Sequence, residues 1–322
     1  MLGSITQGLK AAGKHPRLVF LLWAWYALLS LGPAMPAYAW LSSAMSGSPA
    51  AASALRRFDF GLLGELSNYD QSSVMGLLIS AVMAGGIVAF LSSAFVMGGV
   101  LEIFSSDGET RPFTHRFFRG AGHFFWRFLR LAVIGGVCVA IAVAIVAAAV
   151  GAATSPMADT QWEPGRYLAG FLTVLAVAAT AALFLLGLDY ARVRVARDGS
   201  RGMFRAYFSS LGFVFRHLVP AYAMGLSFVI IVVAAVMLYV AYETNAPAAA
   251  TGAAIATLFV LQQAAVFVRV FARVGLIGAE RDYFGRMSPV PVPVTAPVIP
   301  AVSHAAPEIE PTSLAGVGSP DA

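Results

Sequence analysis

Residues 128–153 read FLRLAVIGGVCVAIAVAIVAAAVGAA, and the only charged side chain among them is Arg130, close to the start. A helix that crosses a bilayer needs about 20 consecutive apolar residues, so this stretch predicts a transmembrane helix. Five further stretches of this kind lie at 18–42, 74–101, 167–191, 217–241 and 249–275. We therefore expect an all-α, polytopic membrane protein, built as a bundle of about six transmembrane helices.

The composition agrees with this expectation and leaves little of the chain for a soluble domain. Hydrophobic residues make up 59% of the chain and charged residues 11%, whereas a soluble domain carries about 25% charged residues. We expect a cytoplasmic N-terminal segment at 1–17, a transmembrane domain at 18–286 and a disordered, proline-rich cytoplasmic tail at 287–322. Residues 43–73 are expected to form a short helix on the outer membrane surface.

Lysine and arginine are distributed unevenly between the loops that join these stretches. If the N-terminus lies in the cytoplasm, 18 of the 21 basic residues fall on the cytoplasmic side, and the exceptions are Arg56, Arg57 and Arg166. Cytoplasmic loops of membrane proteins carry such an excess. We therefore expect a multi-pass protein of the bacterial inner (cytoplasmic) membrane with both termini in the cytoplasm. The net charge of +5 then reflects this topology, and no nucleic-acid partner is expected.

The first apolar stretch allows a second interpretation. Ala37-Tyr38-Ala39 resembles the cleavage site of a signal peptide, and removal of this stretch would leave five spans. The segment before that site is longer than the usual signal peptide of about 15–30 residues. We therefore favour a retained first span.

Two loops of the chain resemble each other and predict an internal repeat. Residues 111–128 read RPFTHRFFRGAGHFFWRF and residues 201–218 read RGMFRAYFSSLGFVFRHL, and an Asp-Gly pair precedes each loop, at Asp107-Gly108 and Asp198-Gly199. Four positions match exactly in residue type: Arg111 with Arg201, Phe118 with Phe208, Gly122 with Gly212, and Phe125 with Phe215. The repeat predicts three helical hairpins that each return to the cytoplasm.

Both loops also have the pattern of amphipathic helices on the membrane surface. Phe113, Phe117, Phe124 and Phe128 share one stripe at helical spacing, beside a stripe of basic residues. Such helices suit the headgroup layer, where arginine attracts anionic lipids. An alternative use of the same surface is docking of a cytoplasmic protein. The expected headgroup contacts are Arg111, Arg116, Arg119, Arg127, Arg201, Arg205 and Arg216.

Few polar side chains lie within the apolar stretches. Gln262 and Gln263 are near the centre of the sixth stretch, where they could form a hydrogen bond between helices or contact a substrate. A second group at the cytoplasmic ends of the spans is expected to form ion pairs, or alternatively a gate or an anion site: Glu102, Asp189, Arg192, Arg269 and Arg273. Small residues recur every four positions in the third stretch and predict close helix packing: Ala132, Gly136, Ala140, Ala144, Ala148 and Ala152.

The sequence contains none of the motifs that mark common catalytic or metal-binding sites. There is no H-E-x-x-H, no G-x-S-x-G, no Walker loop and no Cys/His spacing for a metal. The single cysteine, Cys138, lies within the third stretch and has no partner for an intrachain disulfide. We therefore expect no catalytic residues, no metal, no cofactor and no enzymatic activity.

The Asp-Gly pairs with the loops that follow them, 111–128 and 201–218, carry a family resemblance. In this pattern the chain resembles uncharacterised bacterial six-helix integral membrane proteins and, distantly, the membrane domain of glycerophosphodiester phosphodiesterases. The resemblance implies a membrane location and a helical architecture. The soluble catalytic domain of those phosphodiesterases has no counterpart in this sequence, so the resemblance implies no activity.

These observations lead to two hypotheses about function. The first is a non-enzymatic structural or accessory component of a membrane process, with membrane lipids and a protein partner or a second copy of the chain as its partners. The alternative is a transporter or flippase-like protein for an apolar or amphiphilic substrate. Dense packing motifs and scarce buried charge favour the first, and repeated hairpins favour the second.

Overall fold

Helices are the only regular secondary structure in the part of the chain that a computed structural model describes, and that part contains no β-strand. The described residues are 2–45, 73–106, 109–158, 163–200, 202–245 and 252–288. The expected outer helix within 43–73 and the proline-rich tail lie almost wholly outside these ranges. All the helices belong to one compact unit, Met1–Met287, and the second unit, Ser288–Ala322, is described only at Ser288.

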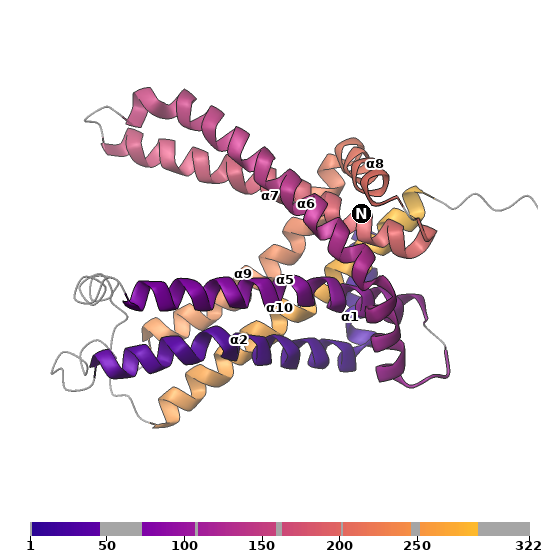
Figure 1. Ribbon diagram of the computed structural model, residues 1–322, viewed down its shortest axis with the longest axis horizontal. Coiled ribbons are helices and arrows are strands. Elements are labelled where there is room, and N and C mark those ends of the chain that lie inside the picture. Colours follow the sequence, from indigo (N-terminus) through magenta and orange to yellow (C-terminus); the bar gives the residue numbers. More distant parts are fainter. Residues whose placement is uncertain are drawn as a thin grey trace, which may run out of the picture. The chain divides into compact units, whose positions relative to one another are not determined.

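Six of the described helices are long and apolar enough to cross a membrane, as expected from the sequence (Figure 1). The chain is therefore a multi-pass membrane protein. The six spans are α2 (Pro16–Met45), α5 (Ser73–Ser105), α6 (Phe113–Ala158), α7 (Glu163–Asp198), α9 (Leu218–Asn245) and α10 (Gly252–Met287). Two further helices, α1 (Leu2–Lys14) and α8 (Met203–Arg216), are too short to span.

The two similar loops have different structures. Residues 113–128 are not a separate surface helix but the first turns of α6, which continues without a break to Ala158. Residues 203–216 do form a separate helix, α8, and His217 separates it from α9. Pro220 explains the break, because a proline ring clashes with the carbonyl group four residues earlier, at Arg216. The corresponding part of α6 contains no proline.

Neighbouring helices along the chain are also neighbours in space. Helix α5 contacts α6, α9 contacts α10, α2 contacts α5 and α1 contacts α10, while α6 and α7 run side by side (Figure 1). These contacts include every pair within the expected hairpins, but the contact of α5 with α6, which joins two different hairpins, is more extensive than any of them. The threefold hairpin repeat therefore stays a prediction.

Buried side chains gather at one end of the spans. Among described residues they lie in α1, α2 up to Leu22, α5 from Ser92, α6 up to Gly135, α7 from Leu186, α8, α9 up to Phe228 and α10 from Val270. The exceptions are Gly165 and Ala169 of α7. We call this region the basic end, because every described lysine and arginine except Arg166 lies in or beside it. The remainder of each span is its far half.

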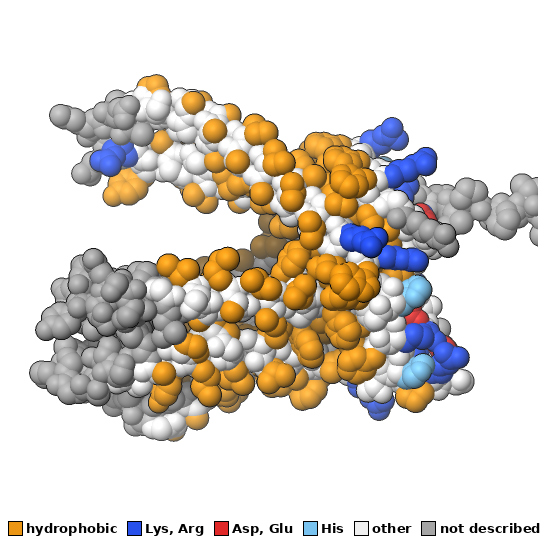
Figure 2. All heavy atoms as spheres, viewed as in Figure 1, with side chains coloured by type: hydrophobic (Ala, Val, Ile, Leu, Met, Phe, Trp, Pro, Cys, Tyr) orange, Lys and Arg blue, Asp and Glu red, His pale blue; other side chains and the backbone are white. Residues whose placement is uncertain are grey.

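The core of the basic end is aromatic, and its exterior is charged. Phe128, Tyr190, Tyr207 and Phe284 come from α6, α7, α8 and α10, and each is at most 1% exposed. The ring of Phe284 is 6.2 Å from that of Tyr190. Figure 2 shows blue basic side chains over this end and orange hydrophobic side chains along the spans. Four helices therefore share one aromatic core at this level.

Glycine allows α1 to pack directly against the backbone of α10. A Cβ atom at Gly8 would lie 2.8 Å from the Cβ of Ala279, and closer still to the carbonyl oxygen of Gly275. A Cβ at Gly278 would lie 3.2 Å from that of Ala11. The N-terminal segment, expected only as a cytoplasmic extension, is thus a helix attached to the last span.

We predict that Gly8→Ala destabilises the protein, because the added methyl group overlaps the α10 backbone. Overpacking of this kind costs about 1–3 kcal/mol. The matched control is Gly13→Ala on the same helix, where a Cβ meets nothing within 4 Å and the higher helix propensity of alanine is a small gain. The measurement is the thermal unfolding midpoint in detergent. Equal midpoints for the two variants would contradict the close packing of α1 on α10.

Candidate functional site at the basic end

A buried carboxylate joins two of the spans at the basic end. Asp189 on α7 is 6% exposed, and Arg273 on α10 donates to it twice, from Nη1 to Oδ2 at 2.8 Å and from Nη2 to Oδ1 at 2.9 Å. Arg192, one turn further along α7, donates from Nη1 to Oδ1 at 3.1 Å. The flat guanidinium of Arg273 fits the carboxylate with both of its outer nitrogens. The expected ion pair between spans is therefore present.

The same region holds a second buried carboxylate, which the sequence analysis did not select. Glu280 on α10 is 0% exposed, and within the described part of the chain neither of its carboxylate oxygens has a hydrogen-bond partner. The hydroxyl group of the fully buried Tyr190 also has none there. Burying a polar group without hydrogen bonds is costly. One signal was available, because Glu280 follows Arg273 by two helical turns and so shares its face.

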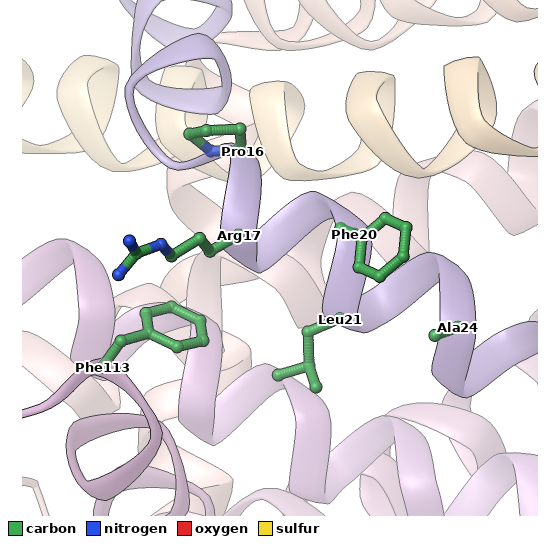
Figure 3. Close-up of a pocket in the computed structure, with 6 residues that line it drawn as sticks. All are labelled: Pro16, Arg17, Phe20, Leu21, Ala24 and Phe113. Atoms are coloured by element: carbon green, nitrogen blue, oxygen red, sulfur yellow. The ribbon is translucent and has the colours of Figure 1, made fainter.

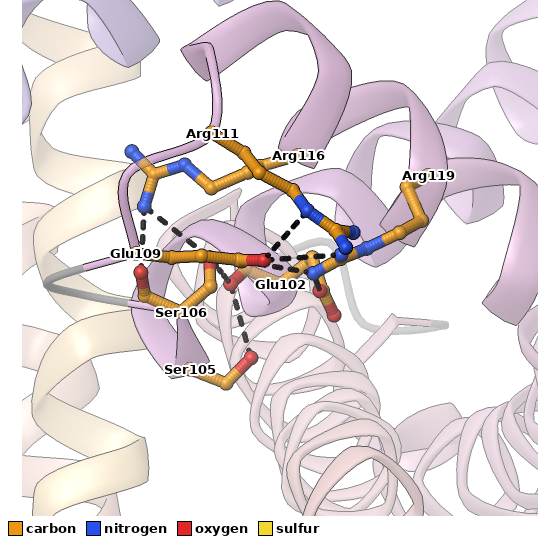
Figure 4. Close-up of polar contacts among 7 residues, drawn as sticks. All are labelled: Glu102, Ser105, Ser106, Glu109, Arg111, Arg116 and Arg119. Carbon is orange, nitrogen blue, oxygen red and sulfur yellow. Dashed lines mark hydrogen bonds and ion pairs between the residues drawn. The ribbon is translucent and has the colours of Figure 1, made fainter.

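A second polar cluster fixes the turn between α5 and α6 (Figure 4). Arg119 of α6 forms ion pairs with Glu102 of α5 and with Glu109 of the turn, the latter at 3.1 Å. Arg111 pairs with Glu109 at 3.3 Å, and Arg116 donates to the carbonyl oxygen of Ser106 at 2.6 Å. The hydrogen bond from Arg119 is the main cause that lowers the pKa of Glu109. This carboxylate therefore stays ionised at neutral pH.

Glycines bring α5 and α6 close enough for these side chains to meet. A Cβ at Gly120 would lie 2.7 Å from the Cγ of Glu102, and a Cβ at Gly99 would lie 2.8 Å from the Cζ of Phe117. Phe117, Phe124 and Phe128, which the sequence analysis expected to face lipid, are buried with at most 8% exposure. These phenylalanines do share one face of the helix, as expected, but most of them pack into the core of the protein.

The arginines expected at lipid headgroups fall into two groups. Arg111, Arg116 and Arg119 bind groups of the α5–α6 turn. Arg205 and Arg216 are exposed and Arg127 is half-buried, and none of these three forms an ion pair within the described ranges. Arg201 lies outside those ranges. Lipid contact by these side chains stays a prediction.

Helix α8 presents a mixed aromatic and basic surface outward. Phe204, Phe208 and Phe215 are 66%, 53% and 55% exposed. Its opposite face is buried, and Tyr207 is fully enclosed there with its hydroxyl group 3.4 Å from the carbonyl oxygen of Phe184. Burial raises the pKa of Tyr207 to about 12. The helix is therefore held firmly on α7 while its aromatic stripe stays available to lipid.

The two glutamines near the centre of the sixth span differ in exposure. Gln262 is exposed and Gln263 is half-buried. Neither side chain forms a hydrogen bond within the described part of the chain, so the expected interhelical hydrogen bond is absent from that part. Both residues lie in the far half of α10, before Val270.

Two recesses of similar size lie near the start of α2. One is an open apolar groove of about 460 Å³, lined by Pro16, Arg17, Phe20, Leu21, Ala24 and Phe113, with the guanidinium of Arg17 reaching toward its edge (Figure 3). The other is polar, has a volume of about 440 Å³ and lies between α1 and α10. In the described ranges no three His, Cys, Asp or Glu side chains are placed to hold a metal ion.

The fold and these clusters define a class of protein rather than a family: a multi-pass helical membrane protein with a polar, well-packed basic end. No protein family, no curated protein and no solved structure matches the chain.

We predict that the two buried carboxylates contribute unequally to the free energy of unfolding. Asp189→Asn leaves two arginines without their anion, and breaking one member of a buried pair costs about 3–5 kcal/mol. We expect about 3 kcal/mol here, because the Arg273 side chain is 42% exposed. Glu280→Gln removes no hydrogen bond and should change the free energy of unfolding by less than about 1 kcal/mol. Unfolding titrations of both variants in mixed micelles measure this difference, and equal losses would contradict it.

Proposed function

We propose that the protein is a non-enzymatic accessory protein of the bacterial inner membrane, and that its spans bind another membrane protein through their far halves. The observation that carries this proposal is the distribution of burial. Apart from Gly165 and Ala169, no described side chain in the far halves is buried, whereas the basic end has a continuous core.

The exposed surface of α6 supports a protein partner rather than lipid alone. Gly136, Ala140, Ala144, Ala148 and Ala152 are all exposed, and a Cβ at Gly136 would meet nothing within 4 Å. A row of small residues at four-residue spacing lets another helix approach closely. Within the described unit no helix uses this row beyond Ala132, so it is free for a helix of a partner.

Gln262 supports the same conclusion from a different span. Its side chain is exposed in the apolar part of α10, and a polar group that faces lipid lacks the hydrogen bonds it would have in water. A partner helix that carries a polar side chain would supply such a bond, worth about 0.6–2 kcal/mol.

The basic end would set the orientation of the complex. In this proposal it lies at the cytoplasmic leaflet, as the excess of arginine predicts, and both termini are cytoplasmic. The exposed Arg205 and Arg216 and the aromatic stripe of α8 would contact anionic headgroups there, at about 1 kcal/mol for each charge.

The test places a photo-crosslinking amino acid at Ala144, in the row of small residues, in living cells. The matched control places it at Ala234, an exposed alanine in the far half of α9. We expect one defined protein adduct from Ala144 and a much weaker one from Ala234. Ala144→Leu should abolish capture of that partner from a neighbouring crosslinker position, since the larger side chain closes the row.

Three outcomes would contradict this proposal. Adducts with lipid alone would place α6 against the bilayer. An adduct with a second copy of this chain would indicate a homo-oligomer instead of an accessory role. Identical capture with Ala144→Leu would mean that the small residues take no part in the contact.

A transporter for an amphiphilic substrate is the second candidate, supported by the combination of a packed basic end and open far halves that expose Gln262. The discriminating variant is Gln262→Leu with Gln263→Leu, and the assay is transfer of fluorescent phospholipids between leaflets of reconstituted vesicles. We expect wild type and variant to fold and to show the same background transfer. Transfer by the wild type that the double variant loses would favour the transporter.

A further inference from the structure

The apolar groove near the start of α2 changes in character along its length. Its walls include Phe20, Leu21 and Ala24 of α2 and Phe113 of α6, and Arg17 lies at one end, in the first turn of α2 (Figure 3). Arg17, Leu21 and Ala24 are spaced by about one helical turn, so they share one face of α2. This face therefore carries a positive charge at the basic end and apolar side chains over the next two turns.

Aromatic contacts hold both walls of the groove in place. The ring of Phe20 lies 5.3 Å from that of Trp23 on the same helix. The ring of Phe113 is stacked on that of Phe117 at 6.4 Å, and Phe117 is only 3% exposed. The shape of the groove is therefore set by the protein itself, before any ligand binds.

Arg17 has no anion from its own chain to neutralise it. Its side chain is exposed, and it forms neither a hydrogen bond nor an ion pair within the described ranges. It is also the second residue of a membrane-spanning helix, where a cation is stable only when it reaches water or pairs with an anion. The N–H donors of its guanidinium are therefore available to a ligand.

The apolar face of α2 continues beyond the groove. Leu28 and Leu31 follow Ala24 by one and two helical turns, so they lie on the same face, and they are 63% and 53% exposed. A long apolar chain that starts in the groove would thus meet apolar side chains along the helix. A charge at one end of a continuous apolar path matches the polarity of a phospholipid.

The volume of the groove argues against a helix of another protein as its occupant. A helix with its side chains is about 10 Å across, so the part of it beside residues 17–24 would fill about 800 Å³. The groove has a volume of about 460 Å³. A single acyl chain is much thinner than a helix, and the groove therefore suits a lipid better.

We propose that this groove binds an anionic phospholipid, with one acyl chain along α2 and the phosphate group on Arg17. Arginine binds phosphate through strong charge-assisted hydrogen bonds, often with two donors at once. An anionic lipid is preferred because the phosphate of a zwitterionic lipid already has a cationic group in its own headgroup. This site is independent of the accessory role proposed above, and its arginine is not one of the expected headgroup contacts.

The experiment uses the full chain reconstituted in phosphatidylcholine vesicles that contain a small fraction of phosphatidylglycerol with a photoreactive diazirine in one acyl chain. Irradiation attaches this lipid to the residues that it contacts, and mass spectrometry of the peptides gives their positions. We expect label on α2 between Phe20 and Leu31 and on α6 near Phe113. Phosphatidylcholine with the same photoreactive chain should label these positions at least fivefold less.

The variant Arg17→Gln tests the phosphate contact. It removes the charge and breaks no contact within the described part of the chain, so we expect the protein to fold and the label in the groove to fall at least fivefold. The matched control is Arg166→Gln, at an exposed arginine outside the basic end, which should leave the label unchanged.

The variant Ala24→Leu tests the acyl-chain contact. Its larger side chain extends into the groove, so the label near Phe113 should fall to a similar extent. The matched control is Ala234→Leu in the far half of α9, where alanine is exposed and the same change should have no effect on the label. Equal thermal unfolding midpoints of all four variants and wild type establish that each one folds.

Three results would overturn the proposal. Equal labelling of the groove by the two photoreactive lipids would mean that the site does not select an anionic headgroup. Labelling that Arg17→Gln leaves unchanged would place the phosphate elsewhere. Displacement of the label by soluble glycerol phosphate as readily as by phosphatidylglycerol would assign the site to a soluble phosphate compound instead of a lipid.

Discussion

The two hydrogen bonds from Arg273 to Asp189 join α10 to α7, and much of the basic end depends on this connection. Helix α10 also contacts α1, α2 and α9, whereas α7 carries α6 and α8. The ion pair therefore adds a polar connection to the aromatic core in which α7 and α8 already contact α10. In an apolar environment a charge is stable only when it is paired and hydrogen-bonded, so the pair specifies one relative position for these two spans.

Close packing by glycine provides the second constraint, and it acts at two places. Gly8 brings α1 against α10, and Gly98, Gly99 and Gly120 bring α5 against α6. Membrane helices gain little from the hydrophobic effect when they associate, because lipid is as apolar as their side chains. Direct backbone contact and buried ion pairs replace that driving force. Both are concentrated at the basic end, which explains why the core lies there.

Within the described ranges the far halves show neither close glycine packing nor buried ion pairs, and this contrast connects the structure to its proposed role. In that proposal the packed end would supply a stable platform in the headgroup region, and the exposed far halves would present small residues and a glutamine to a partner.

Periodicity and bilayer thickness were enough to predict the six spans, because each needs only a local run of about 20 apolar residues. The separation of α8 from α9 also follows locally, from Pro220. The orientation of each helical face was decided by tertiary structure. A stripe such as Phe117, Phe124 and Phe128 shares one face by spacing alone, but spacing does not say whether that face meets lipid or α5.

The same difference between local spacing and tertiary packing explains which residues of the candidate site could be predicted. Asp189, Arg192 and Arg273 could be selected as an ion-pair group because charge near a span must find a partner. The burial of Glu280, the attachment of α1 to α10 and the recess between them depend on contacts between residues far apart in the chain. No local pattern contains those contacts. A local run of apolar residues is enough to mark a span, whereas the side chains that the spans enclose follow from how the helices pack against one another.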